Sequence, residues 1–271
     1  MQKRILVTGG AGFIGTNFVN HLLKRYPDYD VIVLDALTYA GSLDNFSPSI
    51  KESPRFSFIH GDVRNAGLVL ELVSKVDVVV HFAAETHVAR SIYANRKFFE
   101  TDVMGTQSVA SAILKNLDSV ERFIHISTSE VYGTALTRPM DEEHPLNPMN
   151  PYAAAKAGAD RLVYSYWYTY GVPAVIVRPF NQYGPFQHLE KVIPRFITSA
   201  LLGEKLTIHG TGEAKRDWLF VADTCERIDR VLHAPRDRVL GEVFNLGSGD
   251  DRDILSIARM VLRMTGSPES L

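Results

Sequence analysis

A glycine-rich turn near the N-terminus constrains the fold of this chain more than any other feature. The turn reads GGAGFIG at residues 9–15, and it lies between a continuous apolar run, residues 4–8, and a helical pattern that extends to about residue 26. A continuous apolar run of this length is typical of a strand buried on both faces of a parallel sheet. The glycines allow a tight turn, close helix–strand packing and a close backbone approach to a pyrophosphate. We therefore predict a strand–turn–helix unit that binds a dinucleotide.

An acidic residue follows this turn at the spacing that such a site requires. Asp35 stands 20 positions beyond Gly15 and ends the next apolar run, residues 31–35. An acid at this place accepts hydrogen bonds from ribose hydroxyls. The helix that starts at the turn contributes unpaired N–H groups and the positive end of its dipole toward phosphate. Because a carboxylate repels a 2′-phosphate, the sequence predicts NAD rather than NADP.

Apolar runs and helical patterns alternate through the first two thirds of the chain. Further strands are expected at residues 56–60, 76–82, 122–127 and 172–178, and long helices at about residues 95–116 and 151–170. Strands that alternate with crossovers of this length form a parallel sheet with helices on both faces. The predicted fold class is therefore α/β, with a Rossmann-type doubly wound parallel sheet.

The pattern becomes less regular after residue 180. Helices are expected at residues 192–202 and 221–233, and short strands at residues 206–209 and 243–246. We predict a NAD-binding Rossmann domain at residues 1–180 and a smaller C-terminal α/β substrate-binding region at residues 181–271, of which about 217–235 returns to the Rossmann domain. Because the chain stops as a helix at residues 254–265 finishes, we also consider a truncated C-terminus.

Composition and charge exclude several classes of function. The chain has 29 basic and 31 acidic residues, a net charge of −2. This balance provides no positive electrostatic potential that would attract nucleic acid or an anionic membrane. A single cysteine, Cys225, excludes a disulfide framework and a cysteine-rich zinc site, and the histidines lack metal-ligand spacing. No apolar run approaches about 18 residues and no signal peptide is recognisable. We expect a cytoplasmic protein without metal, nucleic-acid partner or membrane.

Tyr152 and Lys156 form a candidate catalytic pair. They are four residues apart at the start of a predicted helix, so both side chains project from one face. A neighbouring ammonium and a cationic nicotinamide both favour the phenolate and lower the pKa of a tyrosine. Such a tyrosine can take a proton from a hydroxyl while the attached carbon gives a hydride to NAD. The same spacing also occurs in surface pairs, and only the dinucleotide context favours catalysis here.

A polar cluster ends the fifth predicted strand, where ligands bind in open α/β sheets. It contains Thr128, Ser129 and Glu130. Thr128 is suited to hydrogen-bonding a substrate hydroxyl, and Glu130 to acting as a base on a carbon made acidic by a neighbouring ketone. A plain helix-capping turn is the alternative interpretation.

These motifs together resemble the extended short-chain dehydrogenases/reductases. The turn at residues 8–15, the Tyr152-x-x-x-Lys156 pair and Thr128 carry this resemblance. Four further segments, residues 35–41, 83–92, 181–185 and 216–218, resemble nucleotide-sugar 4,6-dehydratases, above all the dTDP-glucose type. The resemblance implies oxidation at C4, loss of water across C5 and C6, and hydride return to C6. The product is then a 4-keto-6-deoxy sugar nucleotide, and NAD is regenerated.

Ser129 departs from the dTDP-glucose pattern, which has Thr-Asp-Glu at the strand end. A serine hydroxyl is a poor general acid, because a catalytic acid needs a pKa near the operating pH. Thr-Ser-Glu resembles GDP-mannose and hexosamine 4,6-dehydratases, in which the glutamate is thought to serve both steps. It also resembles UDP-glucuronate decarboxylases. An NDP-sugar 4-epimerase and a non-catalytic NAD-binding scaffold remain further alternatives.

The resemblance and the residue patterns assign a role to each candidate position. Catalysis is expected from Thr128, Glu130, Tyr152 and Lys156. The expected NAD contacts are Gly9, Gly12, Phe13, Ile14, Gly15, Asp35, Ala36, Leu37, Thr38, Gly41, Asp62, Val63, Phe82, Ala83, Ala84, Thr86, Thr101, Tyr152 and Lys156. The expected contacts to the nucleotide-diphosphate sugar are Thr86, Thr128, Asn181, Lys191, Val192, Arg195, Thr207, His209, Arg216 and Asn245.

Some of these assignments have simpler alternatives. Asp62 is equally suited to capping a helix, Arg216 to a surface ion pair and His209 to a loop hydrogen bond. A second phosphate-binding arginine is expected from the resemblance beyond Leu271. The resemblance also implies a homodimer formed through the helices at residues 95–116 and 151–170. The base and the sugar of the substrate stay open.

Overall fold

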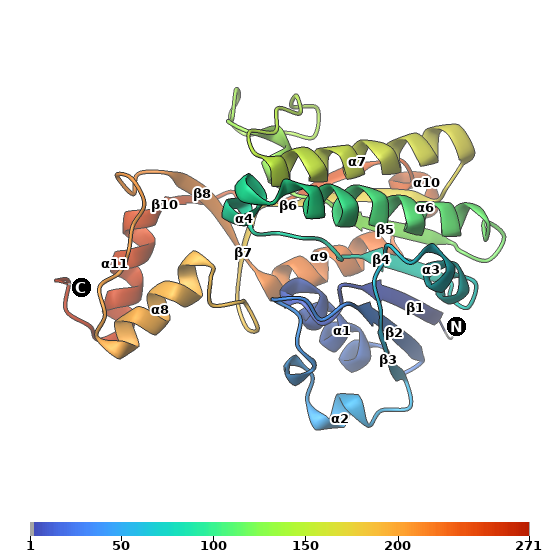
Figure 1. The fold of residues 1–271 in the computed structure, drawn as a ribbon, viewed down its shortest axis with the longest axis horizontal. Helices are drawn as coiled ribbons and strands as arrows, with labels where there is room; N and C mark the ends of the chain where they lie inside the picture. Colours follow the sequence, from blue (N-terminus) through green and yellow to red (C-terminus); the bar gives the residue numbers. More distant parts are fainter. Residues whose placement is uncertain (1–2, 271) are drawn as a thin grey trace.

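Seven strands of the chain pair in parallel to form the central sheet (Figure 1). The structure is a computed structural model that describes residues 3–270. In spatial order the strands are β3 (Phe56–His60), β2 (Tyr29–Asp35), β1 (Lys3–Thr8), β4 (Val78–His81), β5 (Arg122–Ile126), β6 (Ala174–Pro179) and β9 (Val243–Leu246). The strand order reverses between β1 and β4, and ligands bind in such sheets at this switch point. The predicted doubly wound parallel sheet is confirmed.

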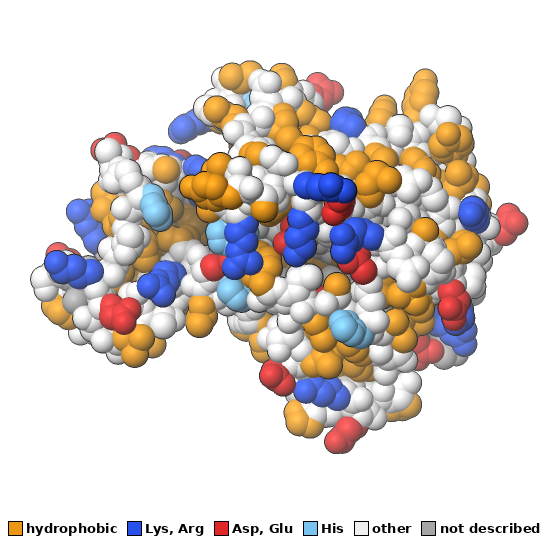
Figure 2. Space-filling view, in the orientation of Figure 1, with side chains coloured by type: hydrophobic (Ala, Val, Ile, Leu, Met, Phe, Trp, Pro, Cys, Tyr) orange, Lys and Arg blue, Asp and Glu red, His pale blue; other side chains and the backbone are white. Residues whose placement is uncertain are grey.

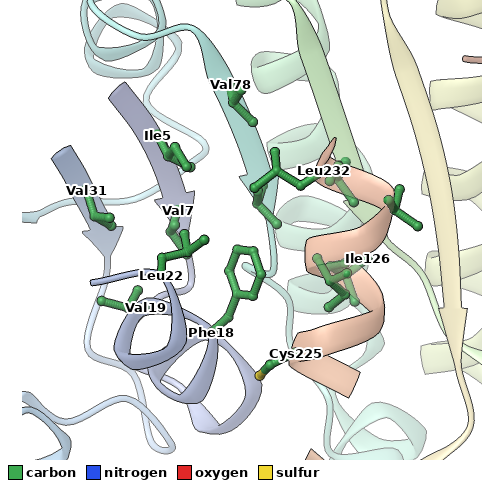
Figure 3. Packing of buried hydrophobic residues seen from close by; sticks show 14 of the residues in the cluster. Ile5, Val7, Phe18, Val19, Leu22, Val31, Val78, Ile126, Cys225 and Leu232 are labelled. Atoms are coloured by element: carbon green, nitrogen blue, oxygen red, sulfur yellow. The ribbon is translucent and has the colours of Figure 1, made fainter. Parts of the chain in front are cut away.

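Helices cover both faces of this sheet (Figure 1). On one face lie α1 (Phe13–Arg25) and α9 (Val221–His233), and on the other α3 (Ala66–Val73), α6 (Thr106–Leu114) and α7 (Pro151–Tyr170). Figure 3 shows Phe18 and Leu22 of α1 packed with Leu232 of α9 beside the strand residues Ile5 and Val7. The strands are apolar on both faces because both are covered, so the continuous runs in the sequence follow from the architecture.

A smaller lobe lies beside the sheet and forms the left side of Figure 1. Its three strands pair in the order β10 (Asp251–Asp253), β8 (Lys215–Phe220) and β7 (Asn181–Tyr183). Helices α8 (Val192–Leu202) and α11 (Ile254–Thr265) pack together with their own apolar core.

The strand predicted at residues 206–209 is absent, and this prediction was wrong. The segment is irregular: Thr207 and His209 are exposed, while Leu206 and Ile208 pack on the core of the lobe. Its alternating pattern therefore marks a loop lying on that core. The strand of this region is β8, in which Leu219 is buried.

The long helix predicted at residues 95–116 consists of three consecutive pieces. These are α5 (Asn95–Phe98), a π-helical turn η2 (Phe99–Gly105) and α6. A π turn contains an extra residue and occurs frequently at functional sites. Here it places Asp102 in the interior, 1% exposed.

Short elements complete the fold. They are η1 (Leu43–Asn45), α2 (Pro48–Lys51), α4 (Val88–Tyr93), η3 (Ser129–Tyr132) and α10 (Arg236–Val239). Within residues 3–270, no helix combines the length and the apolar character that crossing a bilayer requires.

Candidate active site

A cleft of about 390 Å³ runs along the carboxyl ends of the parallel strands. Its walls come from the turn after β1, the segments after β2, β3 and β4, the end of β5 and the start of α7. Residues of the small lobe, among them Lys191 and Trp218, close its far end. The cleft therefore lies between the two parts of the molecule, at the switch point of the sheet.

Gly9 and Gly15 of the glycine turn have no space for a side chain. Gly9 has φ 68°, and a Cβ on it would lie 2.5 Å from the backbone nitrogen of Ala83. A Cβ on Gly15 would lie 2.3 Å from the carbonyl oxygen of Gly9. The helix α1 begins at this point with Gly12 as its N-cap, and no side chain caps it. Its first N–H groups therefore remain free of a side-chain acceptor, which fits a pyrophosphate.

Asp35 is held in place by the backbone around the cleft. Its Oδ2 accepts a hydrogen bond from the N–H of Ala11 at 2.9 Å, and its Oδ1 accepts one from Leu37 at 2.8 Å. Burial raises the pKa of Asp35, and these two backbone bonds oppose the rise. The carboxylate is thus rigid at the edge of the cleft, in the position expected for holding a ribose.

Tyr152 and Lys156 both face the cleft from the first turns of α7. Asn150 caps this helix, since its Oδ1 accepts the N–H of Ala153 at 2.8 Å. Lys156 is 3% exposed, and its Nζ donates to the carbonyl of Ile126 at 2.7 Å. The predicted pair therefore lies beside the end of β5.

The sequence predicts a pKa of Tyr152 lowered by the Lys156 ammonium and a cationic nicotinamide, whereas the protein surroundings of the phenol raise this pKa. Burial raises the pKa of this phenol well above its ordinary value. A hydrogen bond with Thr128 opposes the rise, whereas the negative charges of Asp102 and Glu130 add to it. Sequence reasoning considered the neighbouring ammonium but could not include the desolvation of a fully enclosed phenol.

Thr128 both caps the short helix η3 and lines the cleft. The capping interpretation of the strand-end cluster and the ligand-binding interpretation are therefore compatible. Its Oγ1 accepts the N–H of Glu130 at 3.2 Å at the start of η3. Glu130 also accepts a hydrogen bond from Nδ2 of Asn150 at 3.4 Å. Ser129 lines the same cleft. The four predicted catalytic residues thus meet at one place.

The predicted cofactor residues line this cleft with one exception. Leu37 is absent from the lining; its side chain packs against the main core, and its backbone has φ 48°. Asp62 lines the cleft and pairs with Arg64 at 2.7 Å, while Asn65 caps α3. The capping alternative for Asp62 is therefore wrong.

The predicted substrate residues divide into two groups. The first lines the cleft and comprises Thr86, Thr128, Asn181, Lys191 and Val192. The second lies outside the lining and comprises Arg195, Thr207, His209, Arg216 and Asn245. In the second group, Asn245 uses its side-chain amide within the protein, with the hydroxyl of Tyr132 and the carbonyl of Met140 as partners. The other four are exposed on the small lobe, so the structure does not bring them to the cleft.

Sequence reasoning missed a charged group around Glu190. Its Oε2 lies 3.2 Å from Nε2 of His87 and 3.9 Å from Arg90, and its Oε1 lies 3.7 Å from Lys191. The guanidinium of Arg90 stacks on the ring of Tyr39 at 4.2 Å. Figure 2 shows Lys, Arg and His side chains gathered across the middle of the face of the molecule that it draws. Most of these residues lie in or near the segments that carried the resemblance. That resemblance was the sequence signal that could have pointed to this group.

Two further observations concern the chemistry of the cleft. Glu85 and Lys97 also line it and pair with each other at 2.6 Å. Among residues 3–270, no cluster of three His, Cys, Asp or Glu side chains has the arrangement of a metal site.

The model of the GDP-mannose 4,6 dehydratase family matches residues 6–269. This chain belongs to that family. The low-salt glycan biosynthesis protein Agl12 of Haloferax volcanii is 47% identical over 98% of this chain and 83% of its own length. A dTDP-glucose 4,6-dehydratase of an Actinoplanes species is 43% identical, again over 98% and 83%. The crystal structure of the dTDP-glucose 4,6-dehydratase DesIV of Streptomyces venezuelae has a TM-score of 0.92 with 44% identity, and it covers 98% of this chain and 82% of DesIV.

These comparisons confirm the resemblance to the extended short-chain dehydrogenases/reductases and to their nucleotide-sugar 4,6-dehydratases. The DesIV crystals contained NAD, the cofactor predicted from the glycine turn and Asp35.

Proposed function

We propose that this chain is an NAD-dependent nucleotide-sugar 4,6-dehydratase, with dTDP-glucose as the first substrate to test. The observation that carries the proposal is the convergence of Thr128, Glu130, Tyr152 and Lys156 on one cleft, beside the glycine turn and Asp35. The likeness to named dTDP-glucose 4,6-dehydratases supports the choice of substrate.

The residues present fit NAD. The turn at residues 9–15 and the uncapped start of α1 would hold the pyrophosphate, and the fixed carboxylate of Asp35 would hold a ribose. The chemistry that NAD supplies when bound is reversible hydride transfer. Tyr152 and Lys156 are 8% and 3% exposed, so little solvent reaches these two side chains.

The first step uses Tyr152 as a base. Its phenolate takes the proton of the C4 hydroxyl while C4 becomes a ketone. Thr128, which bonds to the phenol, orients the same oxygen. We infer that the ammonium of Lys156, four residues further along the same helix, stabilises the phenolate.

The second step uses Glu130. The C4 ketone makes the C5 proton acidic, and the Glu130 carboxylate removes it. The same proton then accompanies the C6 hydroxyl as water, since Ser129 provides no acid of suitable pKa. Return of hydride to C6 and of a proton to C5 gives the 4-keto-6-deoxy sugar nucleotide.

We propose that the two parts of the fold divide this work. The Rossmann domain, residues 1–180, would bind NAD and perform the chemistry, and residues 181–271 would bind the nucleotide. The packing of α9 against α1 supports the return of about residues 217–235 to the first domain. The strand β9, residues 243–246, likewise pairs with the central sheet. Lys191, whose Nζ donates to the carbonyl of Thr86 at 3.2 Å, joins the two parts.

A product screen by mass spectrometry tests this function. The purified protein is incubated with dTDP-, UDP-, GDP- and CDP-sugars, including UDP-glucuronate and N-acetylhexosamine nucleotides. Loss of water from one substrate is the expected result and identifies the base. Loss of carbon dioxide would establish a UDP-glucuronate decarboxylase, an isomer of unchanged mass an NDP-sugar 4-epimerase, and no change with any substrate an NAD-binding scaffold.

Tyr152→Phe separates catalysis from binding. This variant removes only the phenolic oxygen, so we expect it to retain bound NAD and to lose at least about 100-fold in kcat, a typical contribution of a general base. Cofactor retention is measured by chromatography of the denatured protein. A variant with full turnover would contradict the role of Tyr152.

We also propose a cytoplasmic homodimer. Exposed aromatic and apolar side chains on α4, η2 and α7 support a dimer interface there; they include Tyr93 (89% exposed), Met104 (56%) and Tyr168 (75%). The buried state of the single thiol, Cys225, is compatible with a reducing compartment. Light scattering coupled to gel filtration would report the oligomeric state.

A further inference from the structure

We propose that Asp102 is a positioning residue for catalysis: it is the counter-ion that keeps the Lys156 ammonium charged beside Tyr152. This inference rests on the proposed function, because it assigns a purpose to a buried carboxylate that the steps above do not use. Asp102 is not among the residues that line the cleft, so we assign it an action through Lys156.

The proposed reaction itself requires a persistent charge at Lys156. The product keeps its C4 ketone, so the proton that Tyr152 takes in the first step is never given back to that oxygen. Once per turnover this proton must leave Tyr152, and one proton must reach C5 in the last step. The phenolate therefore has to be regenerated in every cycle. This is possible near neutral pH only if the neighbouring lysine stays an ammonium.

Lys156 has few groups that could hold its charge. It is 3% exposed, and the hydrogen bond recorded for its Nζ goes to a neutral carbonyl, that of Ile126. Burial lowers the pKa of Lys156, and two carboxylates, Asp102 and Asp160, oppose this change. Asp160 is already paired with two guanidiniums: Arg178 at 2.9 Å and Arg161 at 2.6 Å. Asp102 is thus the carboxylate whose charge is left for Lys156.

Asp102 is placed for this purpose by the π-helical turn. The turn packs against α7, the helix of Lys156, and Asp102 is 1% exposed. Its Oδ1 accepts the N–H of Glu85 at 2.7 Å, whereas its Oδ2 is buried without a hydrogen-bond partner among residues 3–270. Burial of a carboxylate oxygen without a hydrogen-bond partner destabilises the folded state unless a positive charge lies nearby.

Several other ionisable groups surround this pair. Burial lowers the pKa of His81 to about 3 and that of His125 well below its ordinary value, so both histidines are neutral. Glu85 adds negative charge near Asp102, and its own carboxylate is paired with Lys97. On α7, the negative charges of Asp102 and Glu130 raise the pKa of Tyr152, so removing the Asp102 charge lowers the pKa of the phenol as well as that of Lys156.

The titration of the pair has a defined sign. Burial raises the pKa of Asp102 to about 7, and the charge of Lys156 opposes the rise. Removing the carboxylate charge removes a group that raises the pKa of Lys156, so the lysine then loses its proton at lower pH. Activity that depends on the ammonium must therefore disappear earlier on the alkaline side.

The decisive experiment compares pH profiles of kcat for Asp102→Asn and the wild type. The amide oxygen of asparagine can still accept the Glu85 N–H, so the change removes mainly the charge. We expect an unchanged KM and an alkaline limb shifted to lower pH by about one unit, so that kcat measured on that limb falls by about tenfold. Glu100→Gln is the matched control: it removes a charge from the same π turn at a half-exposed side chain, and its profile should match the wild type. A superimposable alkaline limb for Asp102→Asn would overturn the proposal.

A second measurement does not depend on folding of the Asn variant or on activity. In protein labelled with ¹³C at aspartate carboxyls, we expect one carboxyl signal to titrate near neutral pH and to titrate at higher pH in Lys156→Met. An absence of this shift would overturn the pairing. If the product screen shows no turnover, the proposed function fails while this titration still reports the pair. If the shift occurs but the pH profile of the Asn variant does not move, the pair exists without the catalytic role, and the proposal is wrong.

Discussion

Single atoms decide whether the glycine turn can form. At Gly15 an added Cβ would lie 2.3 Å from the carbonyl oxygen of Gly9 and 2.8 Å from the Cα of Gly10, so the strand–helix junction would have to open. The neighbouring contacts are backbone, which cannot move aside as a flexible side chain does. The same closeness lets the backbone approach a pyrophosphate, and stability and binding therefore depend on one missing methyl group.

We accordingly expect Gly15→Ala to lose most bound NAD and to lower the free energy of unfolding by about 1–3 kcal/mol, the usual cost of overpacking. Gly67→Ala in α3 is the control. Its nearest neighbour would be 3.6 Å away, and alanine is the better helix former, so stability should be equal or higher. Chemical unfolding and cofactor content measure both effects. Full NAD retention in Gly15→Ala would show that the turn tolerates the methyl group.

For single residues, the sequence indicated which side chains carry functional groups, but not what surrounds those groups in the fold. The glycine turn, Asp35 and the strand-end cluster are local patterns, and residues of each line the cleft. The raised pKa of Tyr152 was not predictable, because it arises from desolvation by residues distant in sequence. For the same reason, Asn245 could not be recognised as a partner of Tyr132, which lies 113 positions away.

At the scale of elements, helix α7 positions the catalytic pair, and its N-cap connects it to the strand-end cluster. Asn150 bonds through Oδ1 to the N–H of Ala153 and through Nδ2 to Glu130. The cap therefore fixes both the start of the helix and the proposed base of the second step.

We expect Asn150→Ala to lower the free energy of unfolding by about 1 kcal/mol, as loss of a cap does, and also to lower kcat, since Glu130 loses a hydrogen-bond partner. Asn65→Ala, which removes the cap of α3, should cost similar stability with little change in kcat. Thermal unfolding and steady-state kinetics provide the comparison. Equal kcat values for the two variants would show that the contact with Glu130 has no catalytic importance.

Elements with strong local signals were predicted within a few residues, among them α1, α7, α8 and α11. The π turn was not, because its extra residue hardly disturbs an amphipathic pattern. The strand β8 was missed as well. Its residues are mostly exposed or half-buried, so it lacks the apolar run that marks the strands of the central sheet.

At the scale of the whole molecule, the small lobe completes the cleft. Lys191 and Trp218 reach the cleft from this lobe, and burial lowers the pKa of Lys191. The Lys191 contact with the carbonyl of Thr86 places an ammonium where the lobe meets the Rossmann domain, at a position suited to the diphosphate of the substrate.

We expect Lys191→Met to raise KM for the nucleotide sugar by about tenfold, since a charge-assisted hydrogen bond contributes about 1.5–3 kcal/mol. NAD content should stay unchanged, because the turn and Asp35 are untouched. Lys205→Met serves as the control, since this exposed lysine of the same lobe lies outside the cleft lining. An unchanged KM in Lys191→Met, measured by initial rates, would remove Lys191 from the substrate site.

The path of the chain through the small lobe has a consequence for how such proteins can be modified. The lobe contains two separate stretches, residues 181–220 and 251–265, and between them the chain returns to add α9 and β9 to the main body. The lobe core joins Phe196 of the first stretch to Ile257 and Leu262 of the second. The nucleotide-binding region that we propose therefore cannot be transplanted as one continuous segment: a graft from a relative has to exchange both stretches together, with matching halves of that core.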